Sequence, residues 1–188
     1  NGHMSLNFHL CLSPDTIETD PGLLRLVKNA GVTDIWTTGF LYGYWFYPLP
    51  LIRSAIQSIE TAGMKAHGVN VPLGHPGDSL GARSGDVPLS PPAHWGMGVN
   101  ADGSQHSGTS LHPPAVDENC QALIDLQAAG VGEVFVDDDF RLAVAPGTIG
   151  GCFCAEHRRR FTEQHALQAA DWEQLLQAGK VRVADHED

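Results

Sequence analysis

The stretch DPGLLRLVKNAGVTDIW, residues 20–36, joins one helix to one strand across a single glycine and is the best guide to the fold. Asp20 is a typical helix cap, Pro21 suits the first helical position, and apolar residues then recur three and four apart. Gly31 ends this helix, and the β-branched and aromatic residues at 32–36 predict a strand. The stretch therefore predicts one helix–strand unit.

Similar segments lie on both sides of this unit. Further strands are predicted at 6–12, 65–71 and 133–136, and further helices at 50–61, 114–129, 156–165 and, as a short fifth, 171–178. Strands that alternate with helices pair in parallel through right-handed crossovers. The sequence therefore predicts an α/β fold with a parallel sheet.

Two arrangements of such a sheet compete, a closed barrel and an open doubly wound sheet. The long segments 37–49, 72–113 and 140–151 all follow strands, as active-site loops do in barrels. No Gly-x-Gly-x-x-Gly turn follows the first strand, which argues against a dinucleotide-binding sheet. We predict a parallel (β/α) barrel-type fold of about four βα units, half of a TIM barrel.

This prediction sets the expected domain organisation. Residues 1–4 are interpreted as a tag remnant followed by the start Met4, and residues 5–188 as one N-terminal half-barrel domain. The segment 72–113 is rich in Gly, Pro, Ser and His, and we interpret it as a lid or substrate loop, with a disordered insertion as the alternative. Half a barrel exposes strand edges and an apolar face, so we expect a homo-oligomer or a missing C-terminal half.

Composition excludes several classes of partner. With 22 acidic and 11 basic residues the formal charge is −11, which disfavours binding to nucleic acid or to an anionic membrane. No apolar run approaches the ~20 residues that span a bilayer, and no signal peptide is recognised. Two of the four cysteines are one residue apart, which suggests a metal or local redox role and a cytoplasmic setting.

The acidic run Asp137, Asp138 and Asp139 ends the fourth predicted strand. Neighbours on a strand point to opposite faces, so Asp137 and Asp139 are expected to share one face. Three adjacent carboxylates repel one another, and we expect at least one pKa to rise, as a general acid/base requires. Alternatively, one aspartate caps the next turn and another pairs with Arg141.

A Cys-x-Cys-x-x-His motif follows at Cys152, Cys154 and His157. Two thiolates and one imidazole at this spacing suit tetrahedral zinc, which needs a fourth ligand. His112 and Cys120 are the candidates, although Cys120 is expected in the core of a helix. The alternative is a pair of small buried cysteines beside a surface histidine.

Three side chains on predicted strands are candidates for binding a substrate. His9 and His67 can hydrogen-bond a sugar hydroxyl or be satisfied core histidines, and Trp36 can stack on a sugar ring or pack in the core. Arg141 completes this candidate substrate-binding set. A further alternative places His9 or His67 with the aspartates as ligands of a catalytic metal.

Two segments of the sequence resemble a known family, VFVDDDFRL (134–142) and GCFCAEHRRRF (151–161). Together they resemble the clan A glycoside hydrolases of the zinc-containing β-galactosidase type, family 42, and their relatives with an Asp-Asp-Asp-Phe-Arg signature. The resemblance covers about thirty residues. It implies a TIM barrel, an acid/base at Asp139 after Asp138, and structural zinc on Cys152, Cys154 and His157, with His112 as fourth ligand. Aspartates stand here in place of the family's Asn-Glu pair, and His157 in place of its third cysteine.

The resemblance also implies what is missing. The family's nucleophile comes from the seventh strand, which lies beyond the four predicted here, and a retaining mechanism needs two carboxylates ~5 Å apart. The first functional hypothesis is a glycoside hydrolase-like catalytic barrel, present as its N-terminal half, that acts on a carbohydrate by carboxylate acid/base chemistry and is either active or inactive as an isolated half. The alternative is a non-catalytic carbohydrate-binding or self-assembling half-barrel module.

Overall fold

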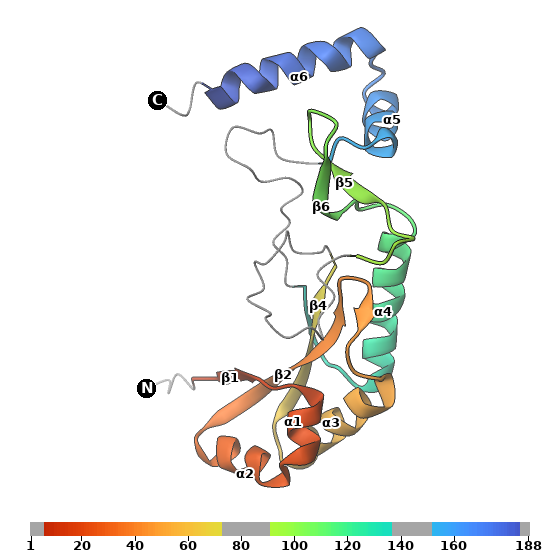
Figure 1. Ribbon diagram of the computed structural model, residues 1–188. Helices are drawn as coiled ribbons and strands as arrows, with labels where there is room; N and C mark the ends of the chain where they lie inside the picture. The colour runs from red at the N-terminus through yellow and green to blue at the C-terminus, as the bar shows by residue number, and fades with distance from the viewer. Residues whose placement is uncertain (1–5, 73–90, 137–151, 185–188) are drawn as a thin grey trace. The chain divides into compact units, whose positions relative to one another are not determined.

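The structure is a computed structural model that describes residues 6–72, 91–136 and 152–184 (Figure 1). The chain divides into two compact units. The first contains the described residues up to 72 and those from 118 to 136. The second contains the described residues from 91 to 117 and from 152 onward.

The first unit contains most of the regular structure. Its elements are β1 (Phe8–Cys11), α1 (Pro14–Thr19), α2 (Pro21–Asn29), β2 (Val32–Leu41), β3 (Tyr44–Trp45), α3 (Leu49–Thr61), β4 (Lys65–Val71), most of α4 (Ala115–Ala129) and β7 (Val134–Val136). The strands pair in the order β1-β2-β4-β7, and every pair along this path is parallel. The short β3 pairs antiparallel with the end of β2. The α/β fold with a parallel sheet is therefore confirmed.

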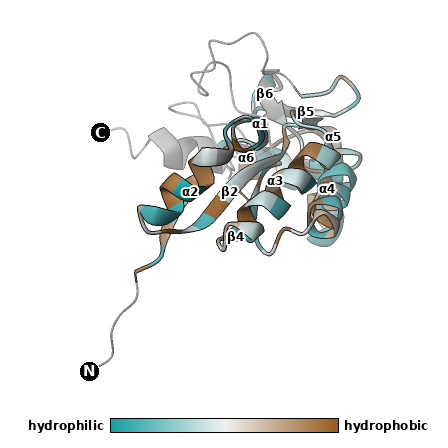
Figure 2. Cartoon of the chain, turned by 90° about the horizontal axis from the view of Figure 1, so that it is seen from below, coloured by the Kyte–Doolittle hydropathy of each residue, from teal (hydrophilic) through white to brown (hydrophobic). Residues whose placement is uncertain are grey.

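One face of this sheet packs against the helices. Ile35 of β2 and Ala66 of β4 share a buried cluster with Ile17 of α1, Ile56 of α3 and Leu126 of α4. Figure 2 shows hydrophobic and hydrophilic residues interspersed along α2, α3 and α4, as expected for helices that bury one face. The hydrophobic core thus lies between the sheet and these helices.

Glycine lets α4 approach the sheet closely. A Cβ added at Gly39 of β2 would lie 2.6 Å from the Val69 carbonyl oxygen and 2.8 Å from Leu126 Cδ1. Both distances are far shorter than a normal contact. The backbone of β2 at Gly39 therefore forms part of the surface on which Leu126 packs.

The predicted helix–strand unit at 20–36 forms as expected. The Gly22 N–H donates to Asp20 Oδ1 at 3.0 Å, so Asp20 caps α2, and Pro21 is the first helical residue. Gly31 follows the helix with φ +97°, a conformation that favours glycine. The chain then enters β2 directly.

The aromatic segment after Trp36 is more regular than predicted. Instead of ending near Trp36, β2 continues to Leu41, and Tyr42 (φ 56°) and Gly43 (φ 87°) turn the chain into β3. The Tyr42 N–H donates to the Val71 carbonyl at 2.9 Å, which holds this turn against the end of β4. This segment joins the sheet because its backbone pairs with neighbouring strands, and the pattern of residue types does not reveal that pairing.

The second unit contains a two-stranded hairpin and two helices. These elements are β5 (Met97–Val99), β6 (Gln105–Thr109), α5 (Ala155–Gln164) and α6 (Ala169–Ala184). The predicted loop 72–113 is thus partly regular, and the predicted short fifth helix is longer than expected. Residues 73–90 of that loop lie outside the described residues.

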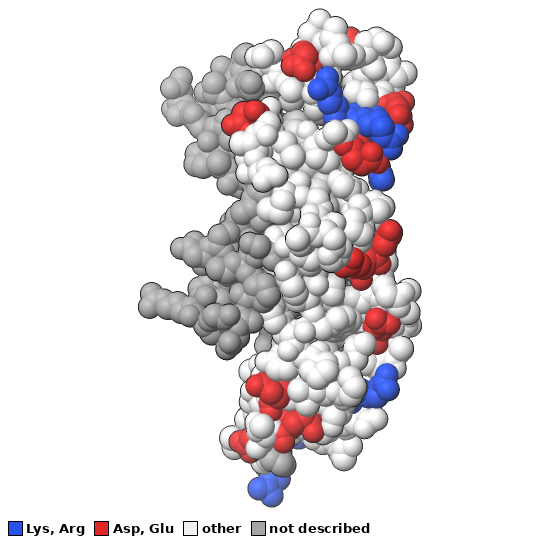
Figure 3. Space-filling model, turned by 45° about the vertical axis from the view of Figure 1, so that its right-hand side comes forward, with Lys and Arg blue, Asp and Glu red and all other residues white. Residues whose placement is uncertain are grey.

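Trp172 of α6 packs against side chains of α5 and of the segment before it. Trp172 is buried and contacts Phe153 and Phe161, with ring centroids 6.0 and 5.8 Å away. The Arg158 guanidinium lies 5.5 Å from the Trp172 ring centre. Figure 3 shows oppositely charged side chains close together in the upper part of the view. Within α5, Glu156 accepts hydrogen bonds from both Arg159 and Arg160.

None of the described helices is long and apolar enough to cross a membrane.

Candidate functional site

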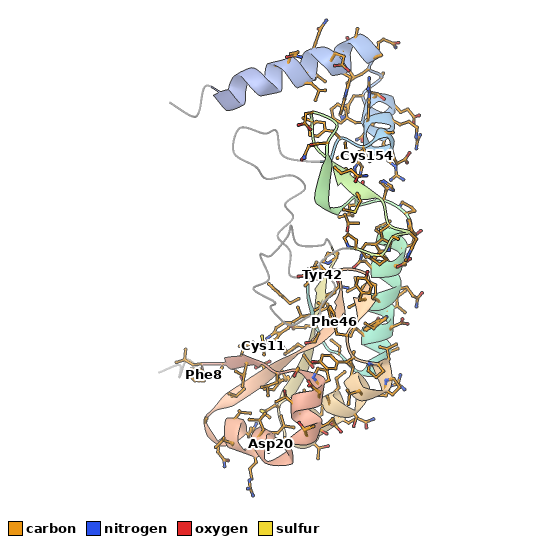
Figure 4. All side chains as sticks on the ribbon, in the orientation of Figure 1. Phe8, Cys11, Asp20, Tyr42, Phe46 and Cys154 are labelled. Atoms are coloured by element: carbon orange, nitrogen blue, oxygen red, sulfur yellow. The ribbon has the colours of Figure 1, made fainter. Side chains whose placement is uncertain are left out.

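Two clusters of chemically active side chains occur in the described residues, one in each unit. The first is the predicted metal centre of the second unit. Cys152 and Cys154 lie just before α5, in the segment where Figure 4 labels Cys154, and His157 lies in its first turn. One ligand atom from each of the three residues lies within 4.8 Å of the others. The cluster could therefore hold a metal ion.

Backbone contacts explain why the three donors converge. The Phe153 N–H donates to the Val99 carbonyl at 2.7 Å, so the segment carrying both cysteines is anchored to β5. Cys154 is the N-cap of α5, and helix geometry then returns His157 to the same side three residues later. The hairpin and the first turn of α5 together position the cluster.

The orientation of His157 suits metal binding. Its Nε2 lies 3.3 Å from the Leu111 carbonyl oxygen, an acceptor, so the hydrogen on Nε2 donates there. Its Nδ1 therefore carries the lone pair and lies 3.6 Å from Cys154 Sγ. A carbonyl that fixes the tautomer in this way is the usual outer partner of a metal-binding histidine.

The distances also fit a tetrahedral ion. With a Zn–S bond of about 2.3 Å and a Zn–N bond of about 2.0 Å, a tetrahedral angle separates sulfur from nitrogen by about 3.5 Å. The observed separation between Cys154 Sγ and His157 Nδ1 is 3.6 Å. Two sulfurs and one imidazole nitrogen form a donor set that suits zinc.

Two neighbouring residues are candidates for the fourth ligand. Ser110 is fully buried, and its Oγ lies 3.2 Å from both sulfurs and 3.4 Å from His157 Nδ1. The His112 ring lies beside that of His157, with centroids 5.4 Å apart. His112 Nδ1 lies 2.9 Å from the Pro113 carbonyl oxygen.

The electrostatics of the cluster favour a thiolate at Cys154. Burial opposes ionisation of this thiol, but hydrogen bonds from the Ser110 hydroxyl, the His157 backbone N–H, Cys152 and His112 outweigh it and lower the pKa of Cys154 to about 7. The thiolate is the form that binds metals. The negative charge of this thiolate therefore favours binding of a cation by the cluster.

The second cluster lies on the face of the sheet opposite the core, in the first unit. Asp34 of β2 and His67 of β4 are both buried, and Asp34 Oδ1 accepts from His67 Nε2 at 2.8 Å. The Thr33 hydroxyl donates to Asp34 Oδ2 at 2.5 Å. The hydrogen bond from Thr33 and then that from His67 lower the pKa of Asp34, which keeps this carboxyl ionised.

Aromatic rings extend this cluster towards solvent. The Trp36 indole stacks on His67 with centroids 4.5 Å apart, and its Nε1–H donates to His9 Nδ1 at 3.0 Å. Phe135 of β7 contacts the edge of Trp36 and is 54% exposed. The predicted substrate-binding residues His9, Trp36 and His67 are therefore neighbours, whereas Arg141 lies outside the described residues.

The remaining predicted site residues are the three aspartates and Cys120. Asp137, Asp138 and Asp139 also lie outside the described residues. Cys120 was expected in a helix core, and this is wrong because it is exposed: the buried residues of α4 are Ala115, Ala122, Leu126 and Ala129, on another face of the helix.

Two members of the clusters were missed by the sequence analysis, Asp34 and Ser110. A charged residue inside the apolar strand VTDIW was the available signal for Asp34, because a buried carboxylate needs partners. Nothing in the sequence around Ser110 marks that residue out.

Comparison with known proteins gave no match: no protein-family profile matches the chain, and no curated protein is significantly similar to it.

Proposed function

We propose that this chain forms part of a (β/α) barrel of the glycoside hydrolase kind and acts on a carbohydrate by carboxylate acid/base chemistry. The observation that carries this proposal is the position of β7. It pairs in parallel with β4, and the residue after its last one is Asp137, the first of the three aspartates. Barrel enzymes place catalytic residues at these carboxyl ends of strands.

The strand order supports the barrel over a doubly wound sheet. A doubly wound sheet reverses its strand order partway, which places helices on both faces. Here the order β1-β2-β4-β7 follows the chain without reversal, and α1, α3 and α4 contribute to one core on one face. In a barrel, the opposite face, which carries Asp34, Trp36 and His67, would form the interior.

The catalytic roles follow from the order of the aspartates. In this proposal Asp139 is the general acid/base, and Asp137 or Asp138 tunes its pKa or holds a sugar hydroxyl. Arg141 and the cluster of His9, Trp36 and His67 supply hydrogen bonds and an aromatic surface for the sugar. A second carboxylate, and the strands that close the barrel, come from a second copy or from further chain.

The metal centre has a structural role in this proposal. Cys152, Cys154 and His157 hold zinc, with His112 as the proposed fourth ligand. A bound zinc would tie the hairpin β5–β6 to the start of α5, since the ligands and their hydrogen-bond partners come from both. The donor set and the 3.6 Å separation of sulfur and nitrogen support this role.

Hydrolysis of aryl glycosides by purified protein tests the catalytic proposal, with Asp139→Asn as the decisive variant. Loss of a general acid/base is expected to lower kcat by about 10²–10⁴-fold without unfolding the protein. Asp117→Asn, an exposed carboxylate on α4, is the matched control. Hydrolysis that is unchanged in Asp139→Asn would contradict the assignment.

A second candidate function is a non-catalytic module that binds carbohydrate or assembles with itself. The exposed Phe135 beside Trp36 favours it, because aromatic faces stack on sugars and exposed apolar residues mark contact surfaces. Sugar binding without turnover by a stable oligomer would favour this function, and Phe135→Ser is expected to weaken that assembly.

A further inference from the structure

A cavity of about 320 Å³ lies where β4 and β7 begin, at the amino ends of the strands. Its lining includes Glu60, Lys65, His67 and Glu133. All of these residues belong to the first unit. The proposed catalytic aspartates follow the carboxyl end of β7, so this cavity is a separate feature.

A buried nitrogen without a hydrogen-bond partner faces this cavity. The His67 side chain is 6% exposed, and its Nε2–H is used by Asp34. The remaining ring nitrogen, Nδ1, is buried and has no hydrogen-bond partner among the described residues. Leaving a buried polar atom in this state costs free energy, so a partner is expected.

The carboxylate of Glu133, another acceptor, lies close to this nitrogen. Glu133 Oε2 lies 3.8 Å from His67 Nδ1, too far for a hydrogen bond. A neutral imidazole that donates through Nε2 has a lone pair on Nδ1, and an ionised carboxylate only accepts. In that tautomer, His67 Nδ1 and the Glu133 carboxylate are two acceptors 3.8 Å apart, with no donor between them among the described residues.

The charges around the cavity also favour a cation. Glu60 and Glu133 line it, and the ionised Asp34 lies directly behind His67. Lys65 is the one cationic side chain in the lining. Two carboxylates thus line the cavity beside one ammonium group, and an added positive charge would reduce the repulsion between them.

We propose that this cavity binds a small organic cation with N–H donors, such as a guanidinium or primary ammonium group, between His67 Nδ1 and the Glu133 carboxylate. Such a group donates to both acceptors at once and neutralises one carboxylate. A cavity of this size accommodates a small organic ligand.

A metal ion fits this cavity less well. Imidazole and carboxylate are metal ligands, but a stable site needs at least a third donor. In the part of the chain that the structure describes, three metal-binding side chains come close together only at Cys152, Cys154 and His157. The cavity offers His67 and Glu133 as a pair, which suits a donor group better than an ion.

The test is imidazole ¹⁵N NMR of the full protein, with the His67 signals assigned by their loss in His67→Gln. Methylguanidinium chloride is the probe, and tetramethylammonium chloride, a cation without N–H groups, is its control at matched ionic strength. We expect methylguanidinium to shift the His67 Nδ1 signal with saturation. Glu133→Gln should weaken this binding at least about tenfold, while Asp117→Asn should leave it unchanged.

Three outcomes would overturn the proposal. The first is an NMR signal showing that His67 Nδ1 already carries a proton at pH 7 and does not respond to the probe. In that case the N–H of His67 itself would be the donor that faces Glu133. The second is an equal response to tetramethylammonium, which would indicate a general ionic effect. The third is binding that is unchanged in Glu133→Gln. None of these readouts depends on glycosidase activity, so the two proposals can fail separately.

Discussion

The carboxylate of Asp34 accepts a hydrogen bond from His67 Nε2 at 2.8 Å across two neighbouring parallel strands, and both side chains are almost completely buried. Asp34 precedes Trp36 by two residues, and Trp36 pairs in register with His67. The two groups therefore meet diagonally on one face of the sheet. This buried pair links the two central strands and positions the ring nitrogen that faces the cavity.

Removing one partner of this pair should destabilise the protein strongly. Asp34→Ala leaves His67 buried without its acceptor, and breaking a buried pair in this way costs about 3 kcal/mol. Urea unfolding followed by circular dichroism measures this loss. The exposed control Asp117→Asn should change the free energy of unfolding by less than about 0.5 kcal/mol. A loss equally small in Asp34→Ala would contradict the buried pair.

The same pair should contribute to the pH dependence of stability. Because the pKa of Asp34 is lower in the folded state, its stabilising effect is present above the unfolded value of about 3.9. That effect is lost as pH falls through the folded pKa. The difference in unfolding free energy between wild type and Asp34→Asn should therefore be constant near neutrality and shrink below pH about 4. A difference independent of pH would show that Asp34 is not ionised in the folded state.

Zinc content should depend on the Cys/His cluster and not on the other cysteines. We expect about one zinc per chain by elemental analysis. Cys154→Ser and His157→Ala should each lose the metal, whereas Cys11→Ser and Cys120→Ser, both exposed, should retain it. Equal zinc content in all four variants would contradict the site.

The fourth ligand can be identified by comparing two variants. If His112 binds the metal, His112→Ala should lower zinc affinity by more than the roughly 10–100-fold that loss of an outer-shell partner costs, and Ser110→Ala should lower it by no more than that. The reverse order would assign the fourth position to the Ser110 hydroxyl, whose oxygen lies 3.2 Å from both sulfurs. A chelator competition measures both affinities under the same conditions.

Gly39 should tolerate no side chain. In Gly39→Ala the new Cβ would lie 2.6 Å from the Val69 carbonyl oxygen and would collide with Leu126, so we expect a loss of about 3 kcal/mol. At Gly132 the nearest atom to an added Cβ is the Ala66 carbonyl oxygen, 3.8 Å away, so Gly132→Ala is the matched control and should be nearly neutral. Similar stability of the two variants would contradict the close packing of α4 on β2.

Local sequence by itself determined the alternation of helices and strands. Asp20, Pro21 and Gly31 act through caps and backbone preferences within a few residues, so the helix between them was predictable. The parallel sheet followed from that alternation. The Cys-x-Cys-x-x-His motif was predictable as a cluster for the same reason, because its members are close in the chain.

Tertiary structure alone decided the contacts between distant segments. Asp34 and His67 meet because β2 and β4 pair in one particular register, and Ser110 reaches the cysteines because the backbone of β5 holds their segment. Register and packing depend on the free energy of the whole core, which no short stretch encodes. The exposed side of α4 that carries Cys120 was likewise set by which of its residues pack against the sheet.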